Sequence, residues 1–181
     1  MVADWAEVNP FHLHFAVSNG SGYDIACASA ESPVLYQLKN DEIHYNEFDF
    51  NIAFTKNLYL IYLNTKQSSA NEIELHSKKF EKKPEVIDRI SEISKLVSSN
   101  RSFVKFMELM QEHESIIAEV TGMKTVQDLN FKNFNGVVKS LGAWGGDFVL
   151  AASNEGEDYV TKYFRKNGFN TILNFDDTVL L

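Results

Sequence analysis

The sequence has a single cysteine, Cys27, among its 181 residues. One cysteine excludes an internal disulfide and provides none of the paired spacings of a cysteine-ligated metal site. No apolar run approaches the roughly 18 residues that a membrane-spanning helix needs, and the first residues lack the basic and apolar regions of a secretory signal. We therefore expect a cytoplasmic protein that neither spans nor is anchored in a membrane.

The sequence also lacks a surplus of basic residues. Lys and Arg number 17 against 25 Asp and Glu, which gives a net charge of −8. Binding to nucleic acid or to an anionic membrane needs a surplus of cations that release counterions, so these partners are not expected. Any anionic ligand must therefore be bound by a local group of donors.

The hydrophobic share of 44% and the charged share of 23% are those of an ordinary folded protein. A chain of this length can form one mid-sized domain or two small ones with a full core. The apolar periodicity predicts helices and strands in alternation, and hence an α+β fold. Helices are expected at about 4–17, 84–98, 102–121 and 155–167, and strands at 34–38, 43–45, 58–63, on both sides of 142–146, and at 169–175.

The stretch from Ser18 to Ser29 combines a glycine-punctuated polar turn with a run of small residues that predicts a helix. Gly20 and Gly22 flank Ser21, and Asp24 follows within the first helical turn. Unpaired backbone N–H groups and the helix dipole favour an anion at such a turn, with the Asp24 carboxylate beside it. An ordinary capped helix start is the alternative interpretation.

A second glycine-rich stretch lies near the other end of the chain. Lys139 is followed by Gly142, Ala143, Gly145 and Gly146 between two predicted strands. Successive N–H groups in such a turn can form a nest for an anion. An elaborate hairpin turn would have the same composition.

These two stretches together resemble the GHMP small-molecule kinases. Ser21-Gly22-x-Asp24 is similar to their catalytic segment, and the run from Gly22 to Ala26 resembles the signature of the GYDIA subgroup. The resemblance implies that Asp24 faces the substrate hydroxyl, that Gly20, Ser21 and Gly22 hold phosphate or Mg²⁺, and that the segment after Lys139 lies over the phosphate. Trp144 and Asp147 depart from the family pattern, which has glycine at both positions.

The resemblance suggests further substrate-binding positions. Lys66 and Ser68 follow a predicted buried strand, where the family has a loop beside the substrate pocket, although a plain solvated turn is an equal alternative. His113 lies in a helix that resembles one beside the substrate, but a packed core histidine is the commoner case. Trp144 could cap the same pocket.

The function that the resemblance implies is phosphorylation of a small-molecule alcohol, a mevalonate-like hydroxy acid or a sugar, with ATP and Mg²⁺ as cofactors. The family's ATP-binding glycine loop does not occur in the sequence. A noncatalytic or partner-dependent half of a split kinase is therefore an alternative, its partner being the missing N-terminal part or a homodimer mate, and a related ATP-dependent decarboxylase is another. We expect part of the catalytic domain at 1–66 and a ferredoxin-like C-terminal domain at 67–181.

Overall fold

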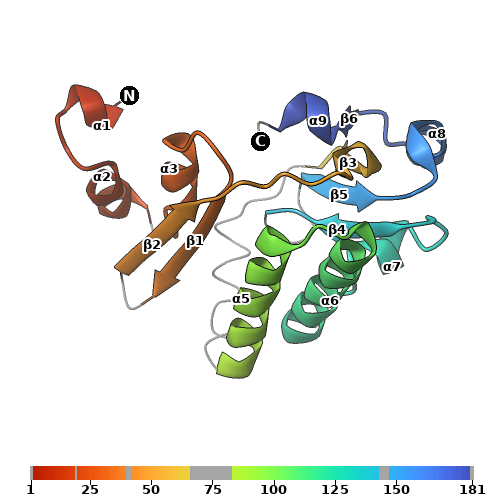
Figure 1. The fold of residues 1–181 in the computed structure, drawn as a ribbon, viewed down its shortest axis with the longest axis horizontal. Coiled ribbons are helices and arrows are strands. Elements are labelled where there is room, and N and C mark those ends of the chain that lie inside the picture. The colour runs from red at the N-terminus through yellow and green to blue at the C-terminus, as the bar shows by residue number, and fades with distance from the viewer. Residues whose placement is uncertain (1, 19, 40–41, 66–82, 143–146, 180–181) are drawn as a thin grey trace. The chain divides into compact units, whose positions relative to one another are not determined.

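The computed structural model describes residues 2–18, 20–39, 42–65, 83–142 and 147–179. It contains helices and antiparallel sheets, so the α+β class predicted from the sequence is confirmed (Figure 1). The chain forms two compact units, one up to Phe50 and one from Asn51 to Val179, which are described separately.

The first unit consists of three short helices and a two-stranded antiparallel sheet. Its elements are α1 (Val2–Trp5), α2 (Pro10–Val17), α3 (Tyr23–Ala28), β1 (Val34–Lys39) and β2 (Glu42–Glu47). The Asn9 side chain caps α2 by accepting hydrogen bonds from the N–H groups of Phe11 (2.9 Å) and His12 (3.2 Å), and Pro10 occupies its first turn. The helix expected at 4–17 is in fact two helices, because Glu7 has a positive φ of 53° that no helix accommodates.

The second unit is built on a four-stranded antiparallel sheet in the order β4-β5-β3-β6. Two crossovers, one through α5, α6 and α7 and the other through α8, make this the β-α-β-β-α-β arrangement of a ferredoxin-like domain, as predicted. The elements are η1 (Thr55–Asn57), β3 (Leu58–Tyr62), α5 (Pro84–Ser99), α6 (Phe103–Thr121), α7 (Val126–Asn130), β4 (Val137–Ser140), β5 (Phe148–Ala152), α8 (Gly156–Lys166), β6 (Ile172–Asn174) and α9 (Phe175–Thr178).

Strand β3 is central to this sheet. It pairs with β5 along one edge and with β6 along the other, so its backbone groups are bonded on both sides. Its burial explains the unbroken apolar run at 58–63. The division into compact units falls between residues 50 and 51, so β3 belongs to the second unit together with the rest of its sheet, and the domain boundary at 66 stays a prediction. The assignment of the units to kinase domains stays a prediction.

The main core of the second unit lies on one face of the sheet. Tyr59 and Ile61 of β3 pack there with residues of β4, β5, α7 and α8. Phe131 is fully buried, and its ring centroid lies 5.1 Å from that of Phe164 on α8. The segment after α7 is thereby fixed to the core, which sets where β4 begins.

Helices α5 and α6 are correctly predicted by their apolar stripes. Ser102 caps α6 at its start, where its hydroxyl accepts from the N–H of Lys105 at 3.4 Å, and Gly122 ends it in the left-handed conformation. Arg89 of α5 joins the pair by donating to both carboxylate oxygens of Glu112 on α6, at 2.6 and 2.8 Å. None of the helices in the described ranges is long and apolar enough to cross a membrane.

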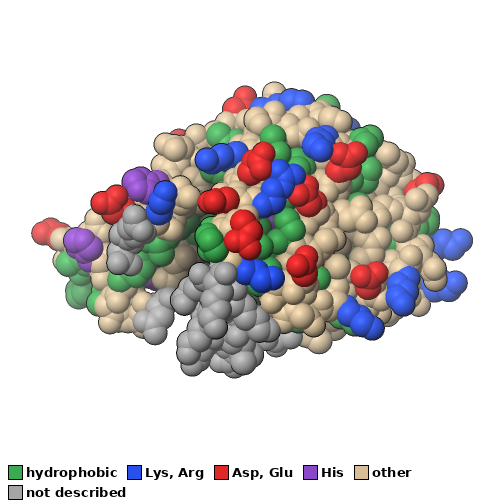
Figure 2. All heavy atoms as spheres, turned by 90° about the horizontal axis from the view of Figure 1, so that it is seen from below, with side chains coloured by type: hydrophobic (Ala, Val, Ile, Leu, Met, Phe, Trp, Pro, Cys, Tyr) green, Lys and Arg blue, Asp and Glu red, His purple; other side chains and the backbone are tan. Residues whose placement is uncertain are grey.

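Charges of both signs are interspersed on the face that Figure 2 draws. Lysine and arginine side chains there alternate with aspartate and glutamate, and no broad basic field appears on that face. This face therefore presents no single-sign charged surface.

Gly136, which precedes β4, should tolerate no side chain. Its φ is 152°, and a Cβ at this position would overlap the carbonyl oxygen of Ala152 on the adjacent strand. We expect Gly136→Ala to lower the free energy of unfolding by about 3 kcal/mol or more, measured by urea denaturation. Gly122→Ala is the control, because its φ is 76° but no atom lies within 4 Å of the added Cβ. It should cost only about 1 kcal/mol of conformational strain. Equal losses in the two variants would contradict the steric argument.

Candidate functional site

The turn before α3 presents Asp24 as the sequence predicts. Gly22 precedes the helix with a φ of 81°, and a Cβ there would contact the Phe11 ring at 3.4 Å. Asp24 lies in the first turn of α3 with its side chain exposed. The left-handed backbone conformation therefore favours glycine, whereas a Cβ would make only an ordinary contact with the ring, and the turn places the carboxylate at the helix start.

Residues Gly20 and Ser21 of this turn form three polar contacts with Ser18, His14 and Tyr36. The Gly20 N–H donates to Ser18 Oγ at 3.1 Å, and His14 Nε2 lies 3.3 Å from the Gly20 carbonyl oxygen. The Tyr36 hydroxyl of β1 donates to the Ser21 carbonyl oxygen at 2.6 Å. The turn is thus fixed between α2 and the hairpin, while phosphate binding by its backbone stays a prediction.

Tyr36 is a neighbour of Asp24 that sequence reasoning missed. Burial and the negative charge of Asp24 together raise the pKa of the Tyr36 hydroxyl. A tyrosine that keeps its proton can continue to donate to Ser21. No local sequence pattern indicated this contact, because Tyr36 on β1 and Ser21 in the turn are 15 positions apart in the sequence.

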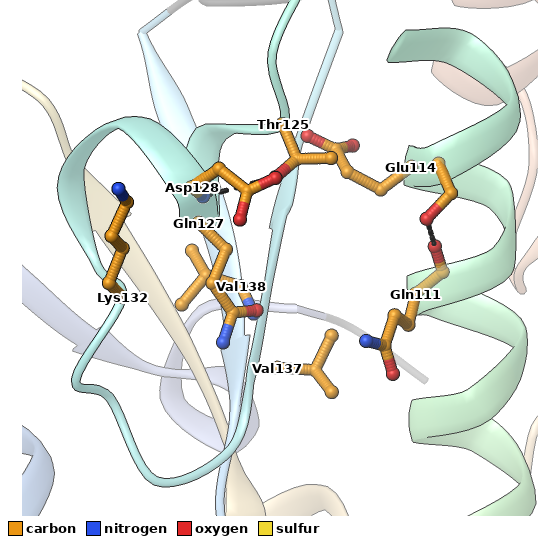
Figure 3. Close-up of a pocket in the computed structure, with 9 residues that line it drawn as sticks. Gln111, Glu114, Thr125, Gln127, Asp128, Lys132, Val137 and Val138 are labelled. Carbon is orange, nitrogen blue, oxygen red and sulfur yellow. Dashed lines mark hydrogen bonds between the residues drawn. The ribbon is translucent and has the colours of Figure 1, made fainter. Parts of the chain in front are cut away.

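The second unit contains a cluster of polar side chains from α6 and β4. Glu114 is only 6% exposed, although it carries a carboxylate. Its Oε1 accepts from Ser140 Oγ at 2.9 Å and from the Val126 N–H at 3.3 Å, and its Oε2 accepts from the Ser140 N–H at 3.3 Å. Figure 3 shows Glu114 reaching from α6 toward Thr125, the cap residue of α7. The carboxylate therefore joins α6, α7 and β4.

His113 and Lys139 lie beside this carboxylate. Burial, and then the positive charge of Lys139, lower the pKa of His113 to about 4. Burial also lowers the pKa of Lys139, and the negative charge of Glu114 opposes that effect. Lys139 Nζ donates to the Ser140 carbonyl oxygen at 2.9 Å. Among the described residues, His113 Nδ1 is buried without a hydrogen-bond partner.

The structure therefore brings two of the predicted residues, His113 and Lys139, together. Gly20, Ser21, Gly22 and Asp24 form a separate group in the first unit. Gly142 lies just past β4 with a φ of 60°. The remaining predicted positions, Lys66, Ser68, Ala143, Trp144, Gly145 and Gly146, lie outside the described residues.

Glu114 and Ser140 were not predicted as site residues. Glu114 follows Met110 by four residues and precedes Ile117 by three, so it lies on the same helix face as these two buried side chains. An acidic residue within an apolar stripe is the signal that could have identified it. Its partner Ser140 carries no such signal, because the contact spans 26 residues.

Two hollows flank the Glu114 carboxylate. One, of about 210 Å³, is mostly polar and is bordered by Gln111, Gln127 and Lys132 (Figure 3). The other, of about 270 Å³, is mostly apolar and is bordered by Leu63 and Ile117. Ser140 lines the second hollow, so the end of β4 adjoins a cavity in the described structure.

Solved structures with the same fold include mevalonate kinases. The chain matches the Methanococcus jannaschii mevalonate kinase with a TM-score of 0.58 and 20% identity, over 77% of this chain and 45% of that one. It matches the L. major mevalonate kinase in complex with R-mevalonate with a TM-score of 0.60 and 14% identity, over 82% and 49%. The Lin0012 protein from Listeria innocua matches with a TM-score of 0.51 and 18% identity, over 72% and 41%.

The chain has a GHMP-kinase-like fold. The resemblance drawn from the two glycine-rich stretches is thus confirmed at the level of the fold. The chain spans less than half the length of these three mevalonate kinase structures. No family model matches the chain, and no curated protein matches its sequence significantly.

The described part of this GHMP-kinase-like chain contains no group of three or more metal-ligating side chains. Mg²⁺ in phosphoryl-transfer sites is often bound by one or two carboxylates and the substrate phosphates. The described residues therefore give no metal site formed by the protein alone.

His113 should make stability depend on acid pH. An unfolded histidine has a pKa near 6.5, whereas the folded pKa is about 4. The unfolded state therefore binds more protons between these values, so the free energy of unfolding should fall as pH drops from about 6.5 to about 4. The loss attributable to His113 should reach roughly 3 kcal/mol at most.

Denaturation of the wild type and of His113→Gln across this pH range tests the expectation. His113→Gln should show a shallower fall, since glutamine takes up no proton. His12→Gln, at an exposed histidine, should match the wild-type slope. An unchanged slope in His113→Gln would show that other groups cause the pH dependence.

Proposed function

We propose that this chain is part of a GHMP-type kinase that transfers phosphate from ATP to a small-molecule alcohol. The observation that carries the proposal is the fold shared with mevalonate kinases, together with a glycine turn that opens a helix bearing Asp24. Since the L. major kinase structure contains R-mevalonate, a mevalonate-like hydroxy acid is the first substrate to test, and a sugar the second.

Asp24 is the proposed catalytic residue. Its exposed carboxylate would accept a hydrogen bond from the substrate hydroxyl and take its proton as the new P–O bond forms. In phosphoryl transfer the transition state is loose, so a weak base suffices when the hydroxyl is well oriented. Tyr36 and His14, which bond to Ser21 and Gly20, would keep the turn in place during this step.

The residues of this chain do not fit a complete ATP site. The sequence lacks the family's ATP-binding loop, and the described part has no cluster of metal ligands. ATP with Mg²⁺ would supply the phosphoryl group when bound. In this proposal Gly20, Ser21 and Gly22 of the first unit would hold phosphate or Mg²⁺. Separately, Lys139 and Gly142 of the second unit would donate to a phosphate group at the end of β4.

A partner-dependent half of a kinase is the second candidate function. It is favoured by the coverage, because the chain spans less than half the length of these three mevalonate kinase structures. The two candidates differ in one measurement: a self-sufficient kinase transfers label from radioactive ATP to an alcohol by itself. A partner-dependent half is inert alone and becomes active when the rest of the fold is supplied.

Replacement of Asp24 tests its catalytic role in the active form of the protein. We expect Asp24→Asn to lower kcat by roughly 10²- to 10⁴-fold with little change in stability, because the amide keeps the shape but loses the base. Label transfer from ATP to R-mevalonate measures kcat, and recovery of a stable, undecarboxylated product separates a kinase from a decarboxylase. Asp176→Asn is the control, an exposed acid in the first turn of another short helix. A normal kcat in Asp24→Asn would show that Asp24 is not the catalytic base and only occupies the first turn of α3.

A further inference from the structure

Ser140, the last residue of β4, has every polar group bound by a charged side chain. Its N–H and its hydroxyl both donate to Glu114, at 3.3 and 2.9 Å, and its carbonyl oxygen accepts from Lys139 Nζ at 2.9 Å. Ser140 is buried, so these bonds are shielded from water. On the other side of the strand, the next residue is held by β5, since the Leu141 N–H donates to the Phe148 carbonyl oxygen at 3.1 Å. The backbone is therefore fixed up to the point where it leaves the sheet.

The burial of the Glu114 carboxylate has an unfavourable desolvation free energy, which the hydrogen bonds to Ser140 alone do not explain. Desolvation of a charged group costs several kcal/mol, and replacement of buried charges by apolar side chains often leaves a fold equally stable. A neutral glutamine could also bond to Ser140 but could not attract a cation. The feature that only a carboxylate provides here is its negative charge beside Lys139, which opposes the effect of burial on the pKa of that lysine.

Lys139 retains hydrogen-bonding capacity in this environment. An ammonium group has three N–H donors, and within the described ranges one of them is bound, to the Ser140 carbonyl oxygen. The other titratable neighbours are His113, whose pKa is lowered to about 4 by burial and then by the lysine's charge, and Glu114, whose two oxygens accept from Ser140 and Val126. A largely buried cation with donors to spare, at the end of β4, suits an anionic oxygen of a ligand.

We propose that Glu114 is a positioning residue that fixes Ser140, and through it the Lys139 ammonium group bonded to Ser140, at the end of β4, so that a phosphate group meets a preformed cationic donor there. This inference rests on the proposed function, which assigns phosphate to this end of the strand. Glu114 acts through Lys139 and touches no ligand itself. The ligand class is a polyphosphate, as in a nucleoside triphosphate.

The test uses tripolyphosphate as the probe, with binding followed by NMR titration of the full chain. Glu114→Gln should weaken binding by about ten-fold or more, the size expected for loss of a charge-assisted hydrogen bond. Lys139→Met should weaken it to a similar extent, and the double variant should be no weaker than Lys139→Met alone, because both residues act through one ammonium group. Glu108→Gln, on the exposed side of the same helix and paired with Lys105 at 3.0 Å, is the control and should bind as wild type.

A second readout needs no ligand and separates positioning from mere stability. The titration of the Lys139 side chain, followed through its ¹³Cε shift, should have a lower midpoint in Glu114→Gln than in wild type, whereas Glu108→Gln should leave it unchanged. Binding is measured where circular dichroism shows each variant fully folded. If Glu114→Gln does not fold, Ser140→Ala removes only the hydroxyl bond, and it should weaken tripolyphosphate binding by a smaller factor.

The failures of the two proposals are distinguishable. If wild type binds tripolyphosphate and the folded Glu114→Gln variant binds equally well, the positioning role is wrong and the proposed function is untouched. An unchanged Lys139 midpoint in Glu114→Gln also overturns the positioning role. If the wild type itself does not bind tripolyphosphate, the end of β4 is not a phosphate site. That result would overturn this inference and also remove Lys139 and Gly142 from the proposed function.

Discussion

The carboxylate of Glu114 is the constraint on which the second unit's first crossover depends. It is buried among α6, α7 and β4, and it accepts hydrogen bonds from Val126 at the start of α7 and from Ser140 at the end of β4. A long crossover that includes α5, α6 and α7 could place β4 in several registers. A buried carboxylate needs hydrogen-bond donors around it, so it favours the register of β4 that places the Ser140 N–H and hydroxyl beside it.

The outer edge of β4 depends on a second polar side chain of the same crossover. The Gln127 amide donates to the Gly136 carbonyl oxygen and accepts from the Val138 N–H, both at 3.0 Å. With Glu114 bound to the Ser140 N–H, side chains take the place of a neighbouring strand along this edge. Unpaired strand edges invite association with other chains, so this cover protects the sheet while it fixes the end of β4.

The two candidate groups of residues hold the backbone in different ways, at the turn before α3 and at the end of β4. In the first unit, the Tyr36 hydroxyl donates to the Ser21 carbonyl oxygen, His14 Nε2 lies 3.3 Å from the Gly20 carbonyl oxygen, and the carboxylate of Asp24 is exposed. In the second unit, charged side chains bind Ser140 and are themselves buried. An exposed acid is available to a substrate, whereas a buried pair of opposite charges is suited to orienting the backbone at the end of a strand.

The sequence by itself determined the elements whose signals are local. Apolar periodicity defined α5 and α6, and the apolar run at 58–63 defined β3, because burial leaves a pattern within a few residues. Tertiary structure alone decided that β3 lies between β5 and β6, and that Glu114 meets Ser140 across 26 residues. Sequence spacing carries no information on such pairings, since they depend on how a whole crossover packs onto a sheet, and the unit boundary and the polar cluster could be read only from the folded chain.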